Sequence, residues 1–242
     1  MKFKVYPDEN ISDLLFGELK LIQKRKGVRY SVDALLISDF VLPLIKKNDH
    51  ILEIGCGSGV ISLILARRSS AKKIIGVEIQ KSLSGMAKRN VELNKMRNRI
   101  EIINMDAKNL TRRFKPGSFD VIISNPPFRK LGNGMISPNK ERAIARYELK
   151  MKMSELIAIC NYLVKPKGKL ALIYPFERMW EMVSEMEKAG LEISRLKFAY
   201  HKKGDPLPVL FCVEASKTRK ALKLEKPWLI ETEKGRFHLD RD

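Results

Sequence analysis

The most specific chemical signal in the sequence is the tetrapeptide Asn125-Pro126-Pro127-Phe128, which directly follows the apolar run Val121–Ser124. Two successive prolines donate no hydrogen bonds and hold φ near about −65°, so they form a rigid bend with its carbonyl groups turned outward. The side-chain carbonyl of Asn125 and the carbonyl of Pro126 can together accept both hydrogens of a planar amino group, which would orient its nitrogen for attack. Phe128 offers a face on which a base can stack. We therefore predict that all four residues are catalytic, without a metal; the alternative is a turn that merely ends the strand.

A second candidate site is the turn Gly55–Gly59, in which glycine alternates with other residues between an apolar run and a segment with helical spacing. Such glycines let a ligand approach the main chain closely, and the following helix points unpaired N–H groups at the turn. Glu53 lies two residues before the turn, and Glu78 lies 19 residues after Gly59 (78 − 59), where a carboxylate can accept hydrogen bonds from ribose hydroxyls. The alternative is a strand–helix turn that needs glycines for its shape alone.

This G-x-G-x-G arrangement with a preceding acid resembles the S-adenosylmethionine site of class I methyltransferases, which implies S-adenosylmethionine as the cofactor. Asp106 follows a third apolar run and could accept a hydrogen bond from an adenine amino group, or it could simply cap its loop. Asp33 lies in the first turn of a predicted helix, where it either suits the helix dipole or contacts the ligand. The predicted cofactor-binding residues are Tyr30, Ser31, Asp33, Glu53, Gly55, Cys56, Gly57, Gly59, Glu78, Ile79, Asp106, Ala107 and Asn125.

The elements that must position these residues alternate between strand and helix, which indicates an α/β fold with a parallel sheet. Ligands bind such sheets at the carboxyl ends of the strands, where Glu53, Glu78 and Asp106 fall. Residues 1–30 are predicted to form an edge hairpin or an irregular lead-in. The predicted strands are 51–54, 73–77, 100–104, 121–124, 169–174, 192–200 and 209–215, and the predicted helices are 32–42, 60–68, 82–94, 142–163 and 177–189.

Four blocks, at residues 30–41, 51–59, 125–128 and 137–148, together resemble the bacterial tRNA adenine-N6 methyltransferase family. The resemblance implies a Rossmann-like class I methyltransferase fold: a seven-stranded, mostly parallel sheet with its last strand antiparallel and helices on both faces. It also implies methyl transfer to adenine N6, in the first place at adenosine 37 of a valine tRNA. Guanine-N2 methylation of rRNA and glutamine-N5 methylation of a release factor share this chemistry and remain open. A non-catalytic RNA-binding module is the alternative of another class.

The charge of the chain favours a nucleic-acid partner. Lys and Arg number 47 against 28 Asp and Glu, a net charge of +19, so a polyanion is the first physical expectation and a solvated lysine-rich surface is the alternative. Basic residues after the tetrapeptide would hold the phosphates that flank a flipped base. These predicted RNA-contacting residues are Arg129, Lys130, Lys140, Arg142 and Arg146. We therefore expect RNA, specifically a tRNA, as the partner.

The remaining features bound the class of protein. Three widely separated cysteines form no C-x-x-C pair, which indicates neither a zinc site nor a disulfide framework. The N-terminus lacks the apolar core of a signal peptide and no apolar run reaches the ~18 residues of a membrane span, so we expect a cytoplasmic protein. We predict an N-terminal lead-in and helix over 1–45, a methyltransferase domain over 46–216 and a basic extension with a possible hairpin over 217–242. The oligomeric state is left open, with a monomer favoured.

Overall fold

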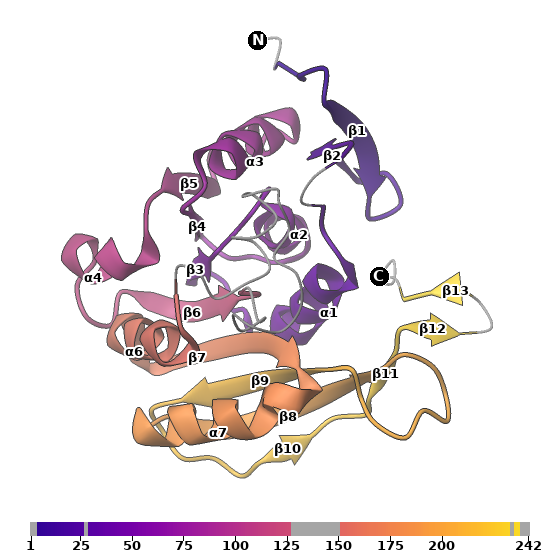
Figure 1. Ribbon diagram of the computed structural model, residues 1–242. Coiled ribbons are helices and arrows are strands. Elements are labelled where there is room, and N and C mark those ends of the chain that lie inside the picture. The colour runs from indigo at the N-terminus through magenta and orange to yellow at the C-terminus, as the bar shows by residue number, and fades with distance from the viewer. Residues whose placement is uncertain (1–3, 27–28, 127–150, 233–234, 238–242) are drawn as a thin grey trace.

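The alternating strands and helices form one mixed sheet with helices on both faces (Figure 1). The computed structural model describes residues 4–26, 29–126, 151–232 and 235–237. Its sheet has the strand order β10-β8-β9-β7-β6-β3-β4-β5. The parallel strands are β3 (His50–Ile54), β4 (Lys73–Glu78), β5 (Ile100–Asn104), β6 (Phe119–Ser124) and β7 (Val164–Pro175), while β9 (Leu210–Ser216) runs antiparallel between β7 and β8 (Glu192–Tyr200).

The predicted fold class is confirmed, but the sheet has nine strands in the described residues rather than seven. The two additional strands, β10 (Lys223–Leu224) and β11 (Trp228–Leu229), each span two residues and pair in parallel with β8. They lie on the side of β8 that would otherwise be the edge of the sheet. An edge strand with unpaired backbone groups is commonly covered in this way.

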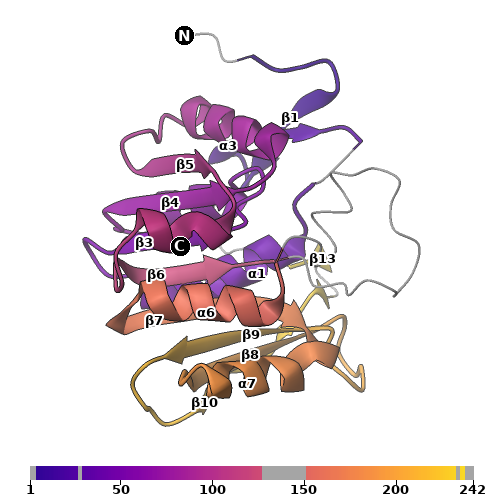
Figure 2. The ribbon, with the colours of Figure 1, turned by 60° about the vertical axis from the view of Figure 1, so that its left-hand side comes forward.

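Two apolar cores fill the space between the sheet and its helices. One core joins the sheet to α1 (Val32–Val41), α2 (Val60–Arg68) and α3 (Lys81–Leu93). The other lies on the opposite face and joins α4 (Leu110–Arg113), α6 (Met153–Leu163) and α7 (Met179–Lys188), the last two being seen in front of the sheet in Figure 2. Strand β3 is covered on both faces and is therefore buried from Ile51 to Ile54, where every residue except Glu53 is apolar.

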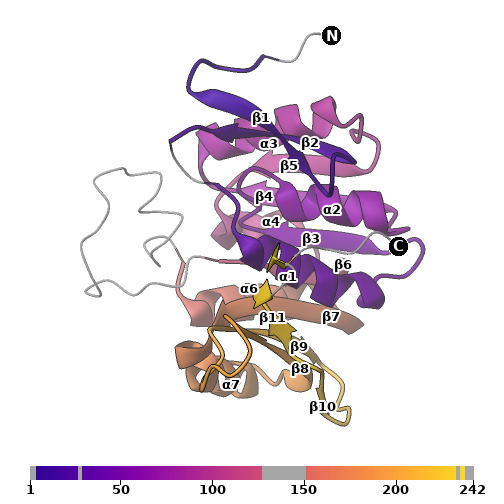
Figure 3. The ribbon, with the colours of Figure 1, turned by 90° about the vertical axis from the view of Figure 1, so that its right-hand side faces the viewer.

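A separate antiparallel hairpin stands beside α3 at the N-terminal end of the chain (Figures 1 and 3). It consists of β1 (Glu9–Leu14) and β2 (Leu19–Lys24), so the hairpin alternative for the lead-in is the one observed. A second small hairpin, β12 (Glu231–Thr232) with β13 (Gly235–Arg236), follows the sheet.

Several predicted boundaries are wrong, among them the start of α6, the start of β7 and the end of α1. Of the helix expected over 142–163, residues 142–150 lie outside the described residues, and Met151 and Lys152 are not helical. Helix α6 begins at Met153, because the Lys152 backbone N–H donates to the Glu155 carboxylate at 2.8 Å. Strand β7 starts at Val164 instead of 169 and includes Gly168, where a Cβ would come within 2.8 Å of the Asp120 carbonyl oxygen. The first helix ends at Val41, and Pro43 belongs to a short 3₁₀ segment, Leu42–Leu44.

The described residues also bear on membranes and metals. None of their helices is both long and apolar enough to cross a bilayer. Within the same residues, no group of three or more His, Cys, Asp or Glu side chains could hold a metal ion. All three cysteines are buried and free of disulfides, and burial raises the pKa of the Cys56 thiol.

Candidate active site

The candidate site lies at the edge of the sheet where the parallel strands end. Strands β3 and β6 are neighbours, with Ile54 opposite Ser124 in the register. From β3 the chain continues to β4 on one side, and from β6 it continues to β7 on the other. Ligands bind open α/β sheets at such a switch point. Gly55 and Asn125 follow directly on the two strands that flank it, and in Figure 2 the arrowheads of these parallel strands point to the right-hand side.

The glycine loop is fixed to the neighbouring strand by its own backbone. The N–H groups of Gly55 and Cys56 donate to the Val77 carbonyl at 2.8 and 3.0 Å. Gly55, Gly57 and Gly59 have φ of +76°, +54° and +85°, a region that side chains with a Cβ rarely adopt. A Cβ on Gly59 would also come within 3.3 Å of the Ala87 Cβ, so this position needs glycine for space as well as for conformation.

Glu78, the last residue of β4, is 6% exposed and is oriented by the main chain on both sides of it. One carboxylate oxygen accepts from the Gly57 N–H at 3.0 Å, and the other accepts from the Gln80 N–H at 2.8 Å. The Asn104 side chain holds the same turn by donating to the carbonyls of Glu78 and Ile79 at 2.8 and 3.1 Å. The glycine loop, the acid and the next strand therefore form one hydrogen-bonded unit.

Glu53 is 1% exposed and faces the start of α2. One of its carboxylate oxygens accepts from both the backbone N–H (2.9 Å) and the side-chain hydroxyl of Ser62. Burial raises the pKa of Glu53 to about 7, the Ser62 hydrogen bonds act in the opposite direction, and the nearby Glu78 raises the pKa further. These contacts fasten the helix behind the glycine loop, and the predicted contact of Glu53 with the cofactor remains a prediction.

Asn125 is positioned by the residue before it. Ser124 is completely buried, and its hydroxyl donates to the Ile54 carbonyl at 2.7 Å. This bond ties the end of β6 to the residue that precedes Gly55, and it places Asn125 beside the glycine loop. Asn125 and Pro126 are half-buried. The other predicted catalytic and RNA-contacting residues, Pro127, Phe128, Arg129, Lys130, Lys140, Arg142 and Arg146, lie outside the described residues.

Asp106 makes the loop-capping contact that was one of its two predicted roles. Its carboxylate accepts from the Lys108 backbone N–H at 3.0 Å and caps the short 3₁₀ helix Ala107–Asn109. Ala107 itself is buried. Asp106 nevertheless follows β5 at the same edge of the sheet as Glu78, and its contact with the cofactor stays a prediction.

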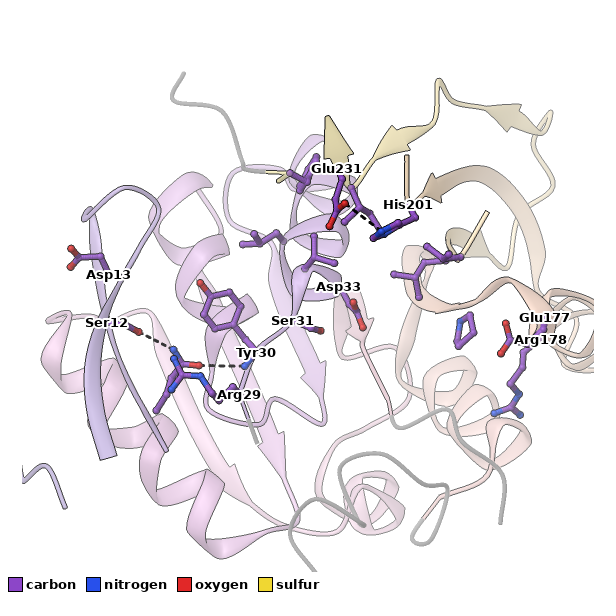
Figure 4. A pocket seen from close by; sticks show the side chains of 18 of the residues that line it. Ser12, Asp13, Arg29, Tyr30, Ser31, Asp33, Glu177, Arg178, His201 and Glu231 are labelled. Carbon is purple, nitrogen blue, oxygen red and sulfur yellow. Dashed lines mark hydrogen bonds and ion pairs between the residues drawn. The ribbon is translucent and has the colours of Figure 1, made fainter. Parts of the chain in front are cut away.

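A cavity of about 1340 Å³ opens beside the start of α1 (Figure 4). Tyr30, Ser31 and Asp33 line it, between Ser12 and Asp13 of the hairpin and a far wall that includes Arg178 and His201. Ser31 occupies the N-cap position without capping the helix through its side chain. Burial raises the pKa of Asp33, while a hydrogen bond with the Ser31 side chain lowers it. The described residues that line the cavity do not include Gly55–Gly59. The predicted cofactor residues therefore fall into two groups, one lining the cavity and one at the glycine loop.

Comparison with known proteins identifies the family. A family model described as the methyltransferase small domain matches residues 26–174, more than half of the chain. The chain belongs to this family. The matched stretch includes the glycine loop, Glu78 and the Asn125 segment, so this methyltransferase domain contains all the edge contacts described above.

Individual relatives confirm the resemblance that the four sequence blocks indicate. A tRNA1(Val) (adenine(37)-N6)-methyltransferase of Trichodesmium erythraeum is 31% identical over 182 residues, which make up 74% of this chain and 74% of that protein. A protein of the same name from Tolumonas auensis is 29% identical over 74% of this chain and 73% of its own length. The crystal structure of a tRNA m1G37 methyltransferase of M. jannaschii superposes on this methyltransferase with a TM-score of 0.61 at 16% identity. The superposition covers 88% of this methyltransferase and 58% of that chain, and it shows a common fold.

Sequence reasoning missed the residues that hold the site together. Ser62, Asn104 and Ser124 fix Glu53, the Glu78 turn and the Asn125 segment, respectively. Only Ser62 carried a recognisable signal, because a serine in the first turn of a helix can pair with an acid on the preceding strand. Asn104 and Ser124 end predicted strands, where a polar residue is common and its partner cannot be read from spacing.

Proposed function

We propose that this methyltransferase transfers the methyl group of S-adenosylmethionine to N6 of an adenine in RNA, namely adenosine 37 of a valine tRNA. The observation that carries the proposal is the hydrogen bond from Ser124 to the Ile54 carbonyl, which sets Asn125 beside the glycine loop at the switch point of the sheet. An amino group gripped by Asn125 would thus lie next to a donor held by Gly55–Gly59. The net charge of +19 and the names of the curated relatives support an RNA substrate.

The residues at this edge fit S-adenosylmethionine. The loop has glycines where the backbone takes positive φ. Because Gly55 and Gly57 have no side chains, a ligand can approach the main chain there closely. Glu78, oriented by the N–H groups of Gly57 and Gln80, supplies the carboxylate that would accept hydrogen bonds from the ribose hydroxyls. When bound, S-adenosylmethionine supplies an electrophilic methyl group attached to a positively charged sulfur.

Asn125 and Pro126 are the residues that orient the substrate amino group. Their carbonyl oxygens accept the two hydrogens of the adenine amino group, and this grip turns the nitrogen toward the donor. As positive charge develops on the nitrogen, both acceptors bind it more strongly, so their effect is concentrated in the transition state. The amino nitrogen would lose one of its two protons to water once the methyl group is transferred, so the proposal needs no general base among the described residues.

The alternatives within the same chemistry are guanine N2 and the glutamine side-chain N5. The charge of the chain favours nucleic acid over a protein substrate. Between the two bases, adenine is favoured by the names of the curated relatives.

One experiment tests both the reaction and the substrate. The protein is incubated with S-adenosylmethionine carrying a labelled methyl group and, separately, with an unmodified valine tRNA transcript, rRNA and a release factor, and the labelled product is identified after digestion. We expect N6-methyladenosine from the tRNA at position 37. Asn125→Ala should abolish this transfer while donor binding stays measurable by calorimetry. Label in guanine or glutamine, or near-normal turnover by Asn125→Ala, would overturn the proposal.

A further inference from the structure

Asn90, in the middle of α3, is completely buried and joins two parts of the molecule that are distant in the sequence. Its side-chain oxygen accepts from the Ile22 backbone N–H at 2.6 Å, and its amide group donates to the Ile22 carbonyl at 3.0 Å. The second hydrogen of that amide goes to the Ser58 carbonyl at 2.9 Å. A carboxamide has two donor hydrogens, so both are used. One side chain therefore connects strand β2 of the hairpin with the glycine loop.

Asn94, the C-cap residue of α3 and four positions after Asn90, provides a natural comparison. It accepts from the Lys20 backbone N–H at 2.9 Å and donates to the Lys20 carbonyl at 2.7 Å, which repeats the pairing of Asn90 with β2. Its remaining contact, however, goes to the Asn90 carbonyl at 2.8 Å, within α3 itself. Both asparagines attach the hairpin to α3, and of the two only Asn90 bonds to the glycine loop in the contacts given above.

The hairpin that Asn90 holds is also a wall of the large cavity. Ser12 and Gln23 line it, and the Gln23 side chain donates to the Ser12 hydroxyl at 2.8 Å (Figure 4). The Gln23 side-chain oxygen in turn accepts from the Tyr30 backbone N–H at 3.4 Å, at the start of α1. Strand β2 and these hydrogen bonds therefore connect the cavity wall, through Ile22 and Asn90, with Ser58.

We propose that Asn90 is a positioning residue that sets the Ser58–Gly59 end of the glycine loop for the methyl donor by fastening that loop to strand β2 of the hairpin. The inference rests on the proposed function.

The first test compares Asn90→Ala with Asn94→Ala in full-length protein without RNA. Both variants detach part of the hairpin and should unfold at lower urea concentrations than the wild type. Only Asn90→Ala should weaken S-adenosylmethionine binding, raising its Kd by roughly three- to tenfold, the effect of about one hydrogen bond, while Asn94→Ala stays within about twofold of the wild type. Equal donor affinities in the two variants would overturn the positioning role. A wild type that binds no donor would instead defeat the proposed function.

A second test uses hydrogen exchange in the wild type, and it decides the matter if Asn90→Ala does not fold. Adding S-adenosylmethionine should slow exchange in peptides covering 56–62 and also in those covering 19–24, because Asn90 bonds to both Ser58 and Ile22. A response confined to 56–62 would refute the positioning role.

Discussion

Replacing Glu53 by Gln should make the stability of the protein less dependent on pH. The Glu53 carboxyl is buried and its pKa is about 7, against an ordinary value of 4.5. A group whose pKa is raised on folding binds its proton more tightly in the folded state, so stability falls as pH rises through the window from about 4.5 to 7. The shift of about 2.5 pKa units corresponds to roughly 3 kcal/mol, lost in full above about pH 8.

Glu53→Gln removes the titrating group and keeps an oxygen that can accept from the Ser62 N–H. At pH 5 the variant and the wild type should therefore differ little in free energy of unfolding. At pH 8.5 the variant should gain roughly 3 kcal/mol relative to the wild type, because it no longer carries a buried charge close to Glu78. Urea unfolding without donor, at half-unit steps of pH between 5 and 8.5, measures the difference between the two proteins and cancels the other titrating groups.

Ser62→Ala supplies an independent check on the cause. The Ser62 hydroxyl stabilises the charged carboxylate, so its removal should raise the pKa of Glu53 and move the loss of stability to higher pH. A difference curve between Glu53→Gln and the wild type that stays flat across the whole range would show that the carboxyl is charged throughout, and burial would then not control its pKa.

Three further experiments, with four substitutions, test the site and the packing beside it. Glu78→Ala should weaken S-adenosylmethionine binding by about 1–3 kcal/mol, because it also leaves the Gly57 and Gln80 N–H groups without this acceptor; unchanged affinity in calorimetry would reject the ribose contact. Ser124→Ala should lower kcat with little change in the Kd for the donor. The control is Ser38→Ala, which removes an equally buried hydroxyl bonded to the Ala34 carbonyl and should lower only the stability. Equal losses of kcat in the two variants would contradict the special role of Ser124. Gly76→Ala should cost about 1–3 kcal/mol in urea unfolding, since its Cβ would lie 2.8 Å from Ile102 Cδ1 and 3.0 Å from Cys56 Sγ, and no loss of stability would contradict the packing.

The parts of the fold that the sequence predicts well are those with a local cause. Strand β8 and helix α2 have the predicted bounds, because apolar residues interleaved with polar ones in β8, and a helical spacing in α2, are each visible within about ten residues. Gly190 closes α7, with φ of +67° just after the C-cap Ala189, and a glycine after a helical spacing is a local signal of this kind. The two-residue strands β10 and β11 could not be predicted, since they exist only because β8 presents an edge to pair with.

The same distinction separates the chemical residues of the site from those that support them. Glu78 and Asn125 are recognisable because the chemistry demands their types at fixed positions after a strand. Asn90 bonds to Ile22 across 68 residues, and Ser124 bonds to Ile54 across 70, so nothing near them in the sequence identifies their partners. A buried polar side chain must find a hydrogen-bond partner, but which one it finds is decided by the fold.

The segment after β9 shows how far such long-range contacts reach. Trp228 is 6% exposed; its indole N–H donates to the Asp39 carboxylate at 2.8 Å, and the Lys197 ammonium lies 3.9 Å from its ring centroid. Asp39 lies near the end of α1, and Tyr30, two residues before the helix begins, donates its backbone N–H to Gln23 of the hairpin. The helix that lines the cavity is therefore held at one end by the N-terminal hairpin and at the other by the C-terminal segment. Both contacts add to the apolar packing of α1 against the sheet, so residues near both ends of the chain help to place Asp33 in the cavity.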